Sequence, residues 1–356
     1  MQRASATRGL RFLPKLAFIT TVGLITAATS YQALATDVFT DPVGFISYTA
    51  VPHGLSFFGF SMTRLPALRG VTGAAVGTKI PINATLTIGQ FNPGPTNYFF
   101  EITSGPNAGF LDDVVSNDTG NVFTLFDDSA IVTANATYKI YPHWSPDTVF
   151  GTPTQSGLVG GSSALAADNV IVWDPVHQAG ATYFYRTNTN GAGPGWRGPQ
   201  GLTTPAGTNT WYLDQGVQVL RLGGTTNLIE QLVGGVKLGP TLVPIAAGPN
   251  GLTFPGFVYA TSTTMDGAGL FTTNSATGVL GGSSALGADN VIIWNAVAQA
   301  GATYFWRTNT NGAGPSWRGP QGLTTPAGTN VIAIGSIFKI LRASGGSFNW
   351  DQQQPY

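Results

Sequence analysis

The chain has 356 residues with 16 basic and 16 acidic side chains, 48 Gly, 23 Pro and no Cys. Charged residues make up only 9% of the sequence and hydrophobic residues 42%, which excludes a disordered chain and a basic surface for nucleic acid. The lack of cysteine excludes disulfides and thiol chemistry. Gly, Thr, Asn and aromatic residues are abundant while Glu occurs only twice, which favours β-strands joined by many turns.

Residues 1–35 are predicted to be a signal peptide. The basic residues of its first segment are Arg3, Arg8, Arg11 and Lys15. An uncharged apolar run over 16–30 follows, and Ala33-Leu34-Ala35 fits the small-x-small cleavage rule. The run is shorter than the roughly 20 residues of a membrane-spanning helix, so we expect cleavage after Ala35 and no transmembrane anchor in the mature chain. Cleavage removes four basic residues and leaves a net charge of 12 − 16 = −4.

Residues 36–156 are expected to form an N-terminal β module with an inserted meander. The segment 98–128 alternates apolar and polar residues around two turn signals, Gly105-Pro-Asn-Ala-Gly and Asn117-Asp-Thr-Gly. Such alternation, broken by Gly, Pro, Asn and Asp, is typical of short antiparallel strands.

A long internal repeat follows this module. Residues 157–209 align without gaps with 278–330 at an offset of 121, and about 44 of 53 positions are identical. The match includes the loop that begins at Thr187 and returns at Thr308, although loops normally diverge first because their side chains pack little. Either a recent duplication or a partner shared by both copies would explain this.

The repeat sets the remaining boundaries. We assign 157–228 to the first copy of the repeated β block, 278–345 to the second copy and 346–356 to a flexible tail. The short β segment 229–277 echoes 45–65, because GLTFPGF at 251–257 resembles GLSFFGF at 54–60. The predicted fold class is all-β, with tandem β-sandwich or barrel-like modules of short antiparallel strands and an internal duplication.

Several short motifs recur in a fixed order along this architecture. They are TDPVGF (40–45), EITSGPNAG (101–109), YPHWSPDTVF (141–150), DNVIVW, YFYR, GWR and a closing VLR. As a set they resemble an uncharacterised family of exported bacterial proteins known mainly from Verrucomicrobia. The likeness covers about residues 36–221 and recurs in part over 278–342, where EITSGPNAG is missing. The family has no assigned activity, so the resemblance implies export and domain order and supplies no catalytic residue.

The sequence offers little for catalysis. Three His lie beyond the signal peptide, and no G-x-S-x-G nucleophile motif is present. His177 is replaced by Ala298 in the second copy. Asp168 and Asp174 could form a glycosidase pair, but the second copy has Asn295 in place of Asp174, and Asp168 suits a structural role at the start of a strand. We therefore predict no catalytic residues and keep a glycoside hydrolase as a remote alternative.

Calcium is the only cofactor that the sequence suggests. A group of carboxylate and amide side chains lies within the predicted meander: Asp112, Asp113, Asn117 and Asp118. Their spacing matches no EF-hand loop, and the alternative is a plain hairpin turn.

The repeated aromatic and arginine residues are the strongest indication of a binding site. They are Tyr185, Arg186, Trp196 and Arg197, repeated as Trp306, Arg307, Trp317 and Arg318. Exposed, they would make two platforms for sugar rings. The alternative is structural, with Trp196 packed against Tyr185 and Arg197 as its polar partner.

Together these features predict a non-enzymatic exported β-rich protein of the cell envelope or extracellular matrix, acting in structure or interaction. It would be periplasmic, cell-surface or extracellular. The alternative is a carbohydrate-binding protein that uses both repeated loops, since two linked sites gain avidity. Expected partners are envelope or matrix proteins, further copies of the chain, or polysaccharide, but not nucleic acid.

Overall fold

Two five-stranded antiparallel sheets contain the two repeated blocks. The computed structural model describes residues 41–310 and 313–356, so the predicted signal peptide lies outside the described residues. The first sheet has the order β11-β10-β9-β12-β2 and the second the order β19-β18-β17-β21-β15. The first consists of β2 (Leu55–Gly59), β9 (Asn169–Asp174), β10 (Ala179–Arg186), β11 (Gly195–Arg197) and β12 (Gly216–Leu220). The second consists of β15 (Leu252–Thr253), β17 (Asn290–Asn295), β18 (Ala300–Arg307), β19 (Ser316–Arg318) and β21 (Phe338–Leu341).

The GLxFxGF segments supply the first strand of each sheet. Strand β2 pairs with β12, the strand that ends the first block, and β15 pairs with β21, which ends the second. The faint echo between 54–60 and 251–257 thus marks corresponding positions in two sheets of the same strand order. Apolar β-branched residues fill the middle strands, which lie between two neighbours and bury Val170 and Val291 completely.

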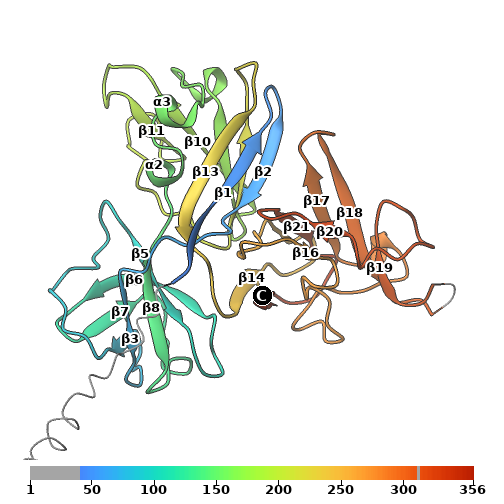
Figure 1. The fold of residues 1–356 in the computed structure, drawn as a ribbon, viewed down its shortest axis with the longest axis horizontal. Helices are drawn as coiled ribbons and strands as arrows, with labels where there is room; N and C mark the ends of the chain where they lie inside the picture. The colour runs from blue at the N-terminus through green and yellow to red at the C-terminus, as the bar shows by residue number, and fades with distance from the viewer. Residues whose placement is uncertain (1–40, 311–312) are drawn as a thin grey trace, which may run out of the picture. The chain divides into compact units, whose positions relative to one another are not determined.

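Each half also carries a two-stranded antiparallel ribbon. Strand β1 (Val43–Ala50) pairs with β13 (Leu228–Gly235), which lies alongside it in Figure 1, and β14 (Thr241–Ile245) pairs with β22 (Phe348–Gln352). In both ribbons the first strand precedes the GLxFxGF strand and the second follows the closing strand of the sheet. A smaller ribbon joins β16 (Thr263–Thr264) to β20 (Val331–Ile332).

The predicted meander forms a third, six-stranded sheet of order β3-β8-β5-β6-β7-β4. Its strands are β3 (Leu68–Val71), β4 (Lys79–Pro81), β5 (Tyr98–Ile102), β6 (Leu111–Asn117), β7 (Asn121–Thr124) and β8 (Thr137–Pro142). A bridge between Thr72 and Ile82 connects the two edge strands, so the sheet curls back on itself. The bridge covers part of the two strand edges, which would otherwise be exposed.

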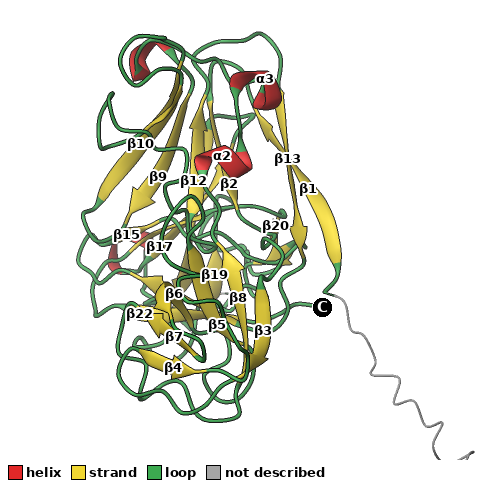
Figure 2. Ribbon diagram, turned by 90° about the vertical axis from the view of Figure 1, so that its left-hand side faces the viewer, coloured by secondary structure: helices red, strands yellow, loops and turns green. Residues whose placement is uncertain are grey.

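Helical structure among the described residues is confined to single turns, as Figure 2 shows. Helices α2 (Pro146–Val149) and α3 (Pro153–Ser156) begin at prolines, whose fixed φ suits the first helical position. The SSAL segment of each copy forms a 3₁₀ turn, at Ala164–Ala166 and Ala285–Gly287. The all-β prediction is therefore confirmed, and no described helix is long and apolar enough to cross a membrane.

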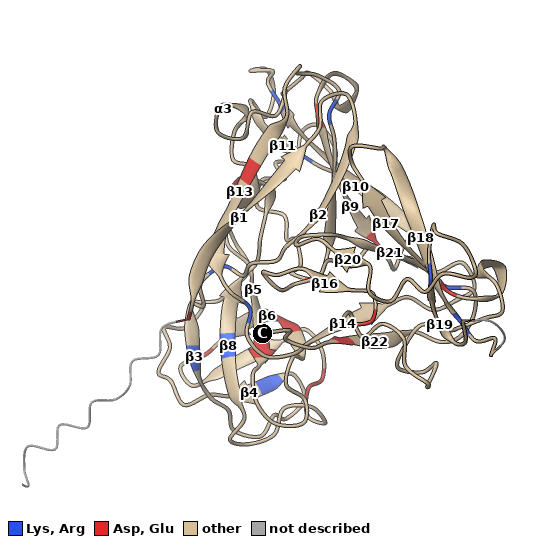
Figure 3. Ribbon diagram, turned by 45° about the vertical axis from the view of Figure 1, so that its right-hand side comes forward, with Lys and Arg blue, Asp and Glu red and all other residues tan. Residues whose placement is uncertain are grey.

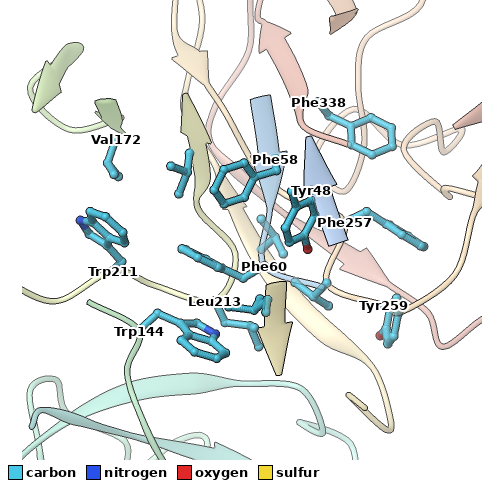
Figure 4. Close-up of a cluster of buried hydrophobic side chains, with 14 of the residues drawn as sticks. Tyr48, Phe58, Phe60, Trp144, Val172, Trp211, Leu213, Phe257, Tyr259 and Phe338 are labelled. Atoms are coloured by element: carbon cyan, nitrogen blue, oxygen red, sulfur yellow. The ribbon is translucent and has the colours of Figure 1, made fainter. Parts of the chain in front are cut away.

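The described residues from Pro42 onward belong to one compact unit that contains two hydrophobic cores. The smaller core lies inside the curled sheet, around Phe91, Phe100 and Tyr138. The larger core is aromatic and draws on both halves: in Figure 4, Phe58 and Phe60 lie between Trp144 and Trp211 on one side and Phe257 and Phe338 on the other. Aromatic packing of this kind compensates for the lack of disulfides. Charged residues are sparse over the whole fold (Figure 3).

Two equivalent buried ion pairs tie each block to its closing strand. Arg221 Nε lies 2.8 Å from Asp168 Oδ2, and Arg342 Nε lies 2.6 Å from Asp289 Oδ2. The Asp168 carboxylate also accepts the backbone N–H groups of Val159, Leu222 and Gly223. Because a buried charge without a partner is costly, these contacts explain why the Arg is kept at the end of the closing strand, where the two copies otherwise diverge.

Candidate functional site

The repeated Trp-Arg pairs lie inside the protein, which corrects their prediction as a sugar-binding platform. Trp196 and Trp317 are 2% and 1% exposed, and Arg197 and Arg318 are 1% and 0% exposed. The Trp196 ring packs edge-to-face on Tyr185, with ring centroids 5.9 Å apart, and its Nε1 donates to the Gly151 carbonyl. These four residues therefore have a structural role, which was the alternative to sugar binding.

The two buried arginines organise the repeated loop. Arg197 donates to the carbonyls of Ala192, Gly193, Trp196 and Leu202 at 2.6–3.1 Å. Arg318 donates likewise to Gly314, Trp317 and Leu323, and to the Ser316 hydroxyl. Turn carbonyls need hydrogen-bond partners when water is excluded. The loop therefore has a structural reason to stay the same in both copies, independent of any shared partner.

The other four residues of the predicted platform are half-buried. Tyr185 and Trp306 pack against the larger core. The Trp306 face is covered by Phe271, with ring centroids 3.9 Å apart and planes 7° from parallel. Arg186 and Arg307 each have a buried Nε without a hydrogen-bond partner, and Arg307 donates from another nitrogen to Leu323. The partial burial of Tyr185 and Trp306 and the ring stacked on Trp306 do not match the exposed platform that was predicted.

The structure does not bring the four predicted calcium ligands together. Asn117 binds the backbone of Thr87 and Phe91, and Asp118 accepts from the turn residues Gly120 and Asn121. Asp112 accepts from the Phe126 amide, whereas Asp113 contacts His143. Within the described ranges, no group of three or more His, Asp or Glu side chains is placed to hold a metal ion.

The carboxylates considered for glycoside hydrolysis are also apart. Asp168 is fully engaged in its buried ion pair, while Asp174 accepts at 2.6 Å from the exposed His177 in the β9–β10 turn. A general acid and a nucleophile must both reach the sugar, which the buried Asp168 does not.

A cavity of about 550 Å³ lies among segments that are far apart in the sequence. Its wall on one side comes from the curled sheet, at Phe99, Leu111 and the 112–113 carboxylates, and on the other from β9, β10 and the segment 210–215. Residues 242–244 and 253–255 of the second half complete it. The larger aromatic rings of the lining are Phe99, Phe126, Trp173, Tyr183, Trp211, Tyr212 and Phe254.

Three polar side chains from distant segments meet in this cavity. His143 Nε2 lies 2.9 Å from Asp113 Oδ1, and the Tyr212 hydroxyl donates to Asp113 Oδ2 at 2.7 Å. Because a carboxylate oxygen accepts, the Nε2 atom carries a proton. Burial and the neighbouring Asp113 carboxylate raise the pKa of Tyr212, so its hydroxyl stays protonated at neutral pH.

Asp214 is a carboxylate of the same cavity that has no cationic partner among the described residues. Burial raises its pKa to about 6; the nearby His143 lowers that pKa and Asp113 raises it. Asp112 is similar: burial and the adjacent Asp128 raise its pKa to about 6, against hydrogen bonds from Phe126 and Asp113 that lower it. Perturbed carboxyl groups in a concave site are typical of functional sites.

Two buried polar atoms of the lining residues lack partners. His143 and Trp211 are 4% and 1% exposed, yet His143 Nδ1 and Trp211 Nε1 make no hydrogen bond. Buried polar atoms are nearly always hydrogen-bonded in proteins. Both residues line the cavity, so a polar group held there is one way in which these atoms could be satisfied.

Sequence reasoning missed this site because its residues are scattered from Phe99 to Pro255. One signal was present. Residues 210–215 all line the cavity, and they begin directly where the two copies stop matching at Asn209. Asp214 corresponds to Gly335 in the second copy and Tyr212 to Ala333. The divergent segment, rather than the repeated loop, contributes Tyr212 and Asp214 to the cavity.

Comparison with known proteins adds no relative: no protein-family model, curated protein or solved structure matches this chain. The resemblance to an exported bacterial family stays a prediction.

Proposed function

We propose that this chain is a non-enzymatic exported β-rich protein that acts by binding, and that the cavity beside Asp214 is its ligand site. The observation that carries the proposal is the cavity itself. Small-molecule sites have volumes of about 300–1,000 Å³ and combine apolar walls with a few convergent polar groups. A volume of about 550 Å³, aromatic walls and the Asp113–Tyr212 contact meet that description.

The surroundings of His143 favour binding over catalysis. In a nucleophilic site the imidazole holds a carboxylate on one nitrogen and a hydroxyl or thiol on the other. Here Nε2 contacts Asp113, and the buried Nδ1 contacts no nucleophile among the described residues. Tyr212 is protonated and bound to the same carboxylate.

Fragment screening by NMR on the chain from residue 36 tests this proposal. Fragments are expected to shift the indole N–H signal of Trp173, which lines the cavity and is only partly buried. The variant Ala181→Phe places a ring in the cavity wall and should abolish binding. The repeat offers a matched control, because Ala302 is the equivalent residue of β18 and does not line the cavity.

Ala302→Phe is therefore expected to bind fragments as the unmodified chain does. Circular dichroism of both variants checks that each is folded. Binding that persists in a folded Ala181→Phe variant, or a screen without any cavity binder, would reject the proposal.

Self-association is a second candidate function, favoured by the outer face of the β1–β13 ribbon. Phe45 and Val233 are opposite each other in the register and 67% and 68% exposed, and Val43 and Ile229 are 66% and 63% exposed. The outward face carries no charge, so two copies could meet without repulsion. The equivalent face of β14–β22 has Pro244, Asn349 and Asp351 exposed instead.

A further inference from the structure

The charges of the cavity select one class of ligand, an inference that rests on the proposed binding function. Of the Asp, Glu, Lys and Arg residues, only Asp is found in the lining, at Asp112, Asp113, Asp174 and Asp214. The lining contains no Lys or Arg, and His143 is its only basic side chain. Lys339 lies close by, with Nζ 5.4 Å from the Phe254 ring centroid, but it is not part of the lining.

The partners of these carboxylates differ. Asp113 is held by His143 and Tyr212, and Asp174 by His177. Among the described residues, none donates a hydrogen bond to the Asp214 side chain from another position or forms an ion pair with it, although the nearby His143 lowers its pKa. No ion pair within the described part of the chain neutralises this partly buried carboxylate, so a cation entering the cavity would be attracted by its charge.

The aromatic walls are suited to the same charge. Trp, Tyr and Phe rings attract cations to their faces, Trp most strongly, and such rings are the usual partners of alkylated ammonium groups. Trp173 is half-buried and Tyr212 is 39% exposed, so both rings have surface open to the cavity. The mouth adds apolar surface at Leu125, Phe126 and Val176, which are 50%, 65% and 83% exposed.

We propose that the cavity binds an organic cation, in which an ammonium group is held by the Asp214 carboxylate and the aromatic rings and an attached apolar group fills the remaining wall. An anionic ligand would meet four carboxylates and no lysine or arginine. A metal ion would lack ligands, because the described acidic residues form no chelating group. A neutral sugar would leave Asp214 without a counter-charge.

Two ligands of the same shape test the proposal. Benzyltrimethylammonium carries the positive charge, and neopentylbenzene is its neutral isostere. Titration calorimetry of the chain from residue 36 is expected to show at least a tenfold tighter dissociation constant for the cation. In Asp214→Asn the preference should fall below about threefold while the affinity for neopentylbenzene is unchanged.

The control is Asp266→Asn, which makes the same charge change at an exposed residue outside the lining and should behave as the unmodified chain. Equal affinity of the unmodified chain for both ligands would overturn the cation inference and leave the binding function standing. Failure of both ligands to bind would also overturn it, and the fragment screen decides separately whether the cavity binds anything. The ligand preference needs no variant, so the test holds even if Asp214→Asn does not fold.

Discussion

Trp173 Nε1 donates to the carbonyl of Leu252 at 2.7 Å, which links the hairpin of the first repeated block to the opening strand of the second sheet. The reciprocal bond runs from Trp294 Nε1 to the Leu55 carbonyl at 2.8 Å. Gln178 and Gln299 add the same pair of contacts to Leu252 and Leu55. Each copy of the block thus binds the first strand of the other copy's sheet. Neither the sequence of the block nor that of the short strand predicts this exchange.

Replacing either tryptophan is expected to weaken the contact between the two halves by a similar amount. Trp173→Phe and Trp294→Phe keep an aromatic ring and remove the donor, so each should lower the free energy of unfolding by about 1–2 kcal/mol. Urea unfolding followed by circular dichroism measures both. A loss in one variant with none in the other would show that the two contacts are not equivalent.

Glycine is required where the two halves touch. A Cβ on Gly256 would lie 2.9 Å from the Gly59 Cα, and a Cβ on Gly59 would lie 2.7 Å from the Gly256 Cα. Gly256→Ala should therefore cost about 1–3 kcal/mol of unfolding free energy through overpacking against backbone. Gly346→Ala is the control, since no atom lies within 4 Å of its Cβ. Equal stability of the two variants would contradict the close approach.

The protein is expected to be more stable near pH 5 than near pH 7.5. Burial raises the pKa of Glu230 to about 7, against a weaker lowering by a Gln231 hydrogen bond, and its Oε2 atom has no partner. The folded state then binds more protons than the unfolded state between about pH 4.5 and 7, so stability falls as pH rises through this window. Asp112 and Asp214 act in the same direction up to about pH 6.

Glu230→Gln should remove on the order of 1–2 kcal/mol of that pH dependence, after allowance for solvent screening. Thermal unfolding of both forms at pH 5, 6 and 7.5 measures it. A pH profile that is the same in both proteins would exclude Glu230 as its source.

Binding of benzyltrimethylammonium should tighten as pH rises from 5 to 7. With a pKa of about 6, Asp214 changes from about one tenth to about nine tenths ionised over this range, which predicts a nearly tenfold gain in affinity. The other titratable groups that line the same cavity are Asp112, Asp113, Asp174, His143, Tyr183 and Tyr212. Neopentylbenzene should show little change, and Asp214→Asn should flatten the cation profile. A cation affinity that falls with pH would point to another group.

Self-association is expected to depend on the apolar ribbon and not on calcium. Phe45→Asp should dissociate any oligomer seen by light scattering, because it introduces a charge beside Val233 at the centre of the exposed face. Asn349→Asp makes an exposed charge change on the equivalent ribbon and should have no effect. Assembly that depends on calcium and is reversed by a chelator would instead support the predicted calcium site, which the placement of residues 112–118 does not favour.

Local patterns predicted the secondary structure well. The alternation over 98–128, around the turn signals at 105–109 and 117–120, predicted the strands β5, β6 and β7. The short helices α2 and α3 were not foreseen, since four-residue helices leave no apolar period to detect. The correspondence of 54–60 with 251–257 also predicted equivalent strands, because both segments must bury the same apolar residues against a closing strand.

The sequence by itself determined the all-β class, the strand-rich repeated blocks and the absence of disulfides, because turn residues, alternation and composition act locally along the chain. Only the tertiary structure decided that Trp196 and Arg197 are buried. A loop of Gly, Pro and Thr can have the same sequence whether its carbonyls accept hydrogen bonds from an arginine or from water. The cavity likewise depends on long-range packing. No sequence motif marks Asp113, His143 or Asp214 as functional. They line one cavity because the curled sheet packs against the segment in which the two copies diverge.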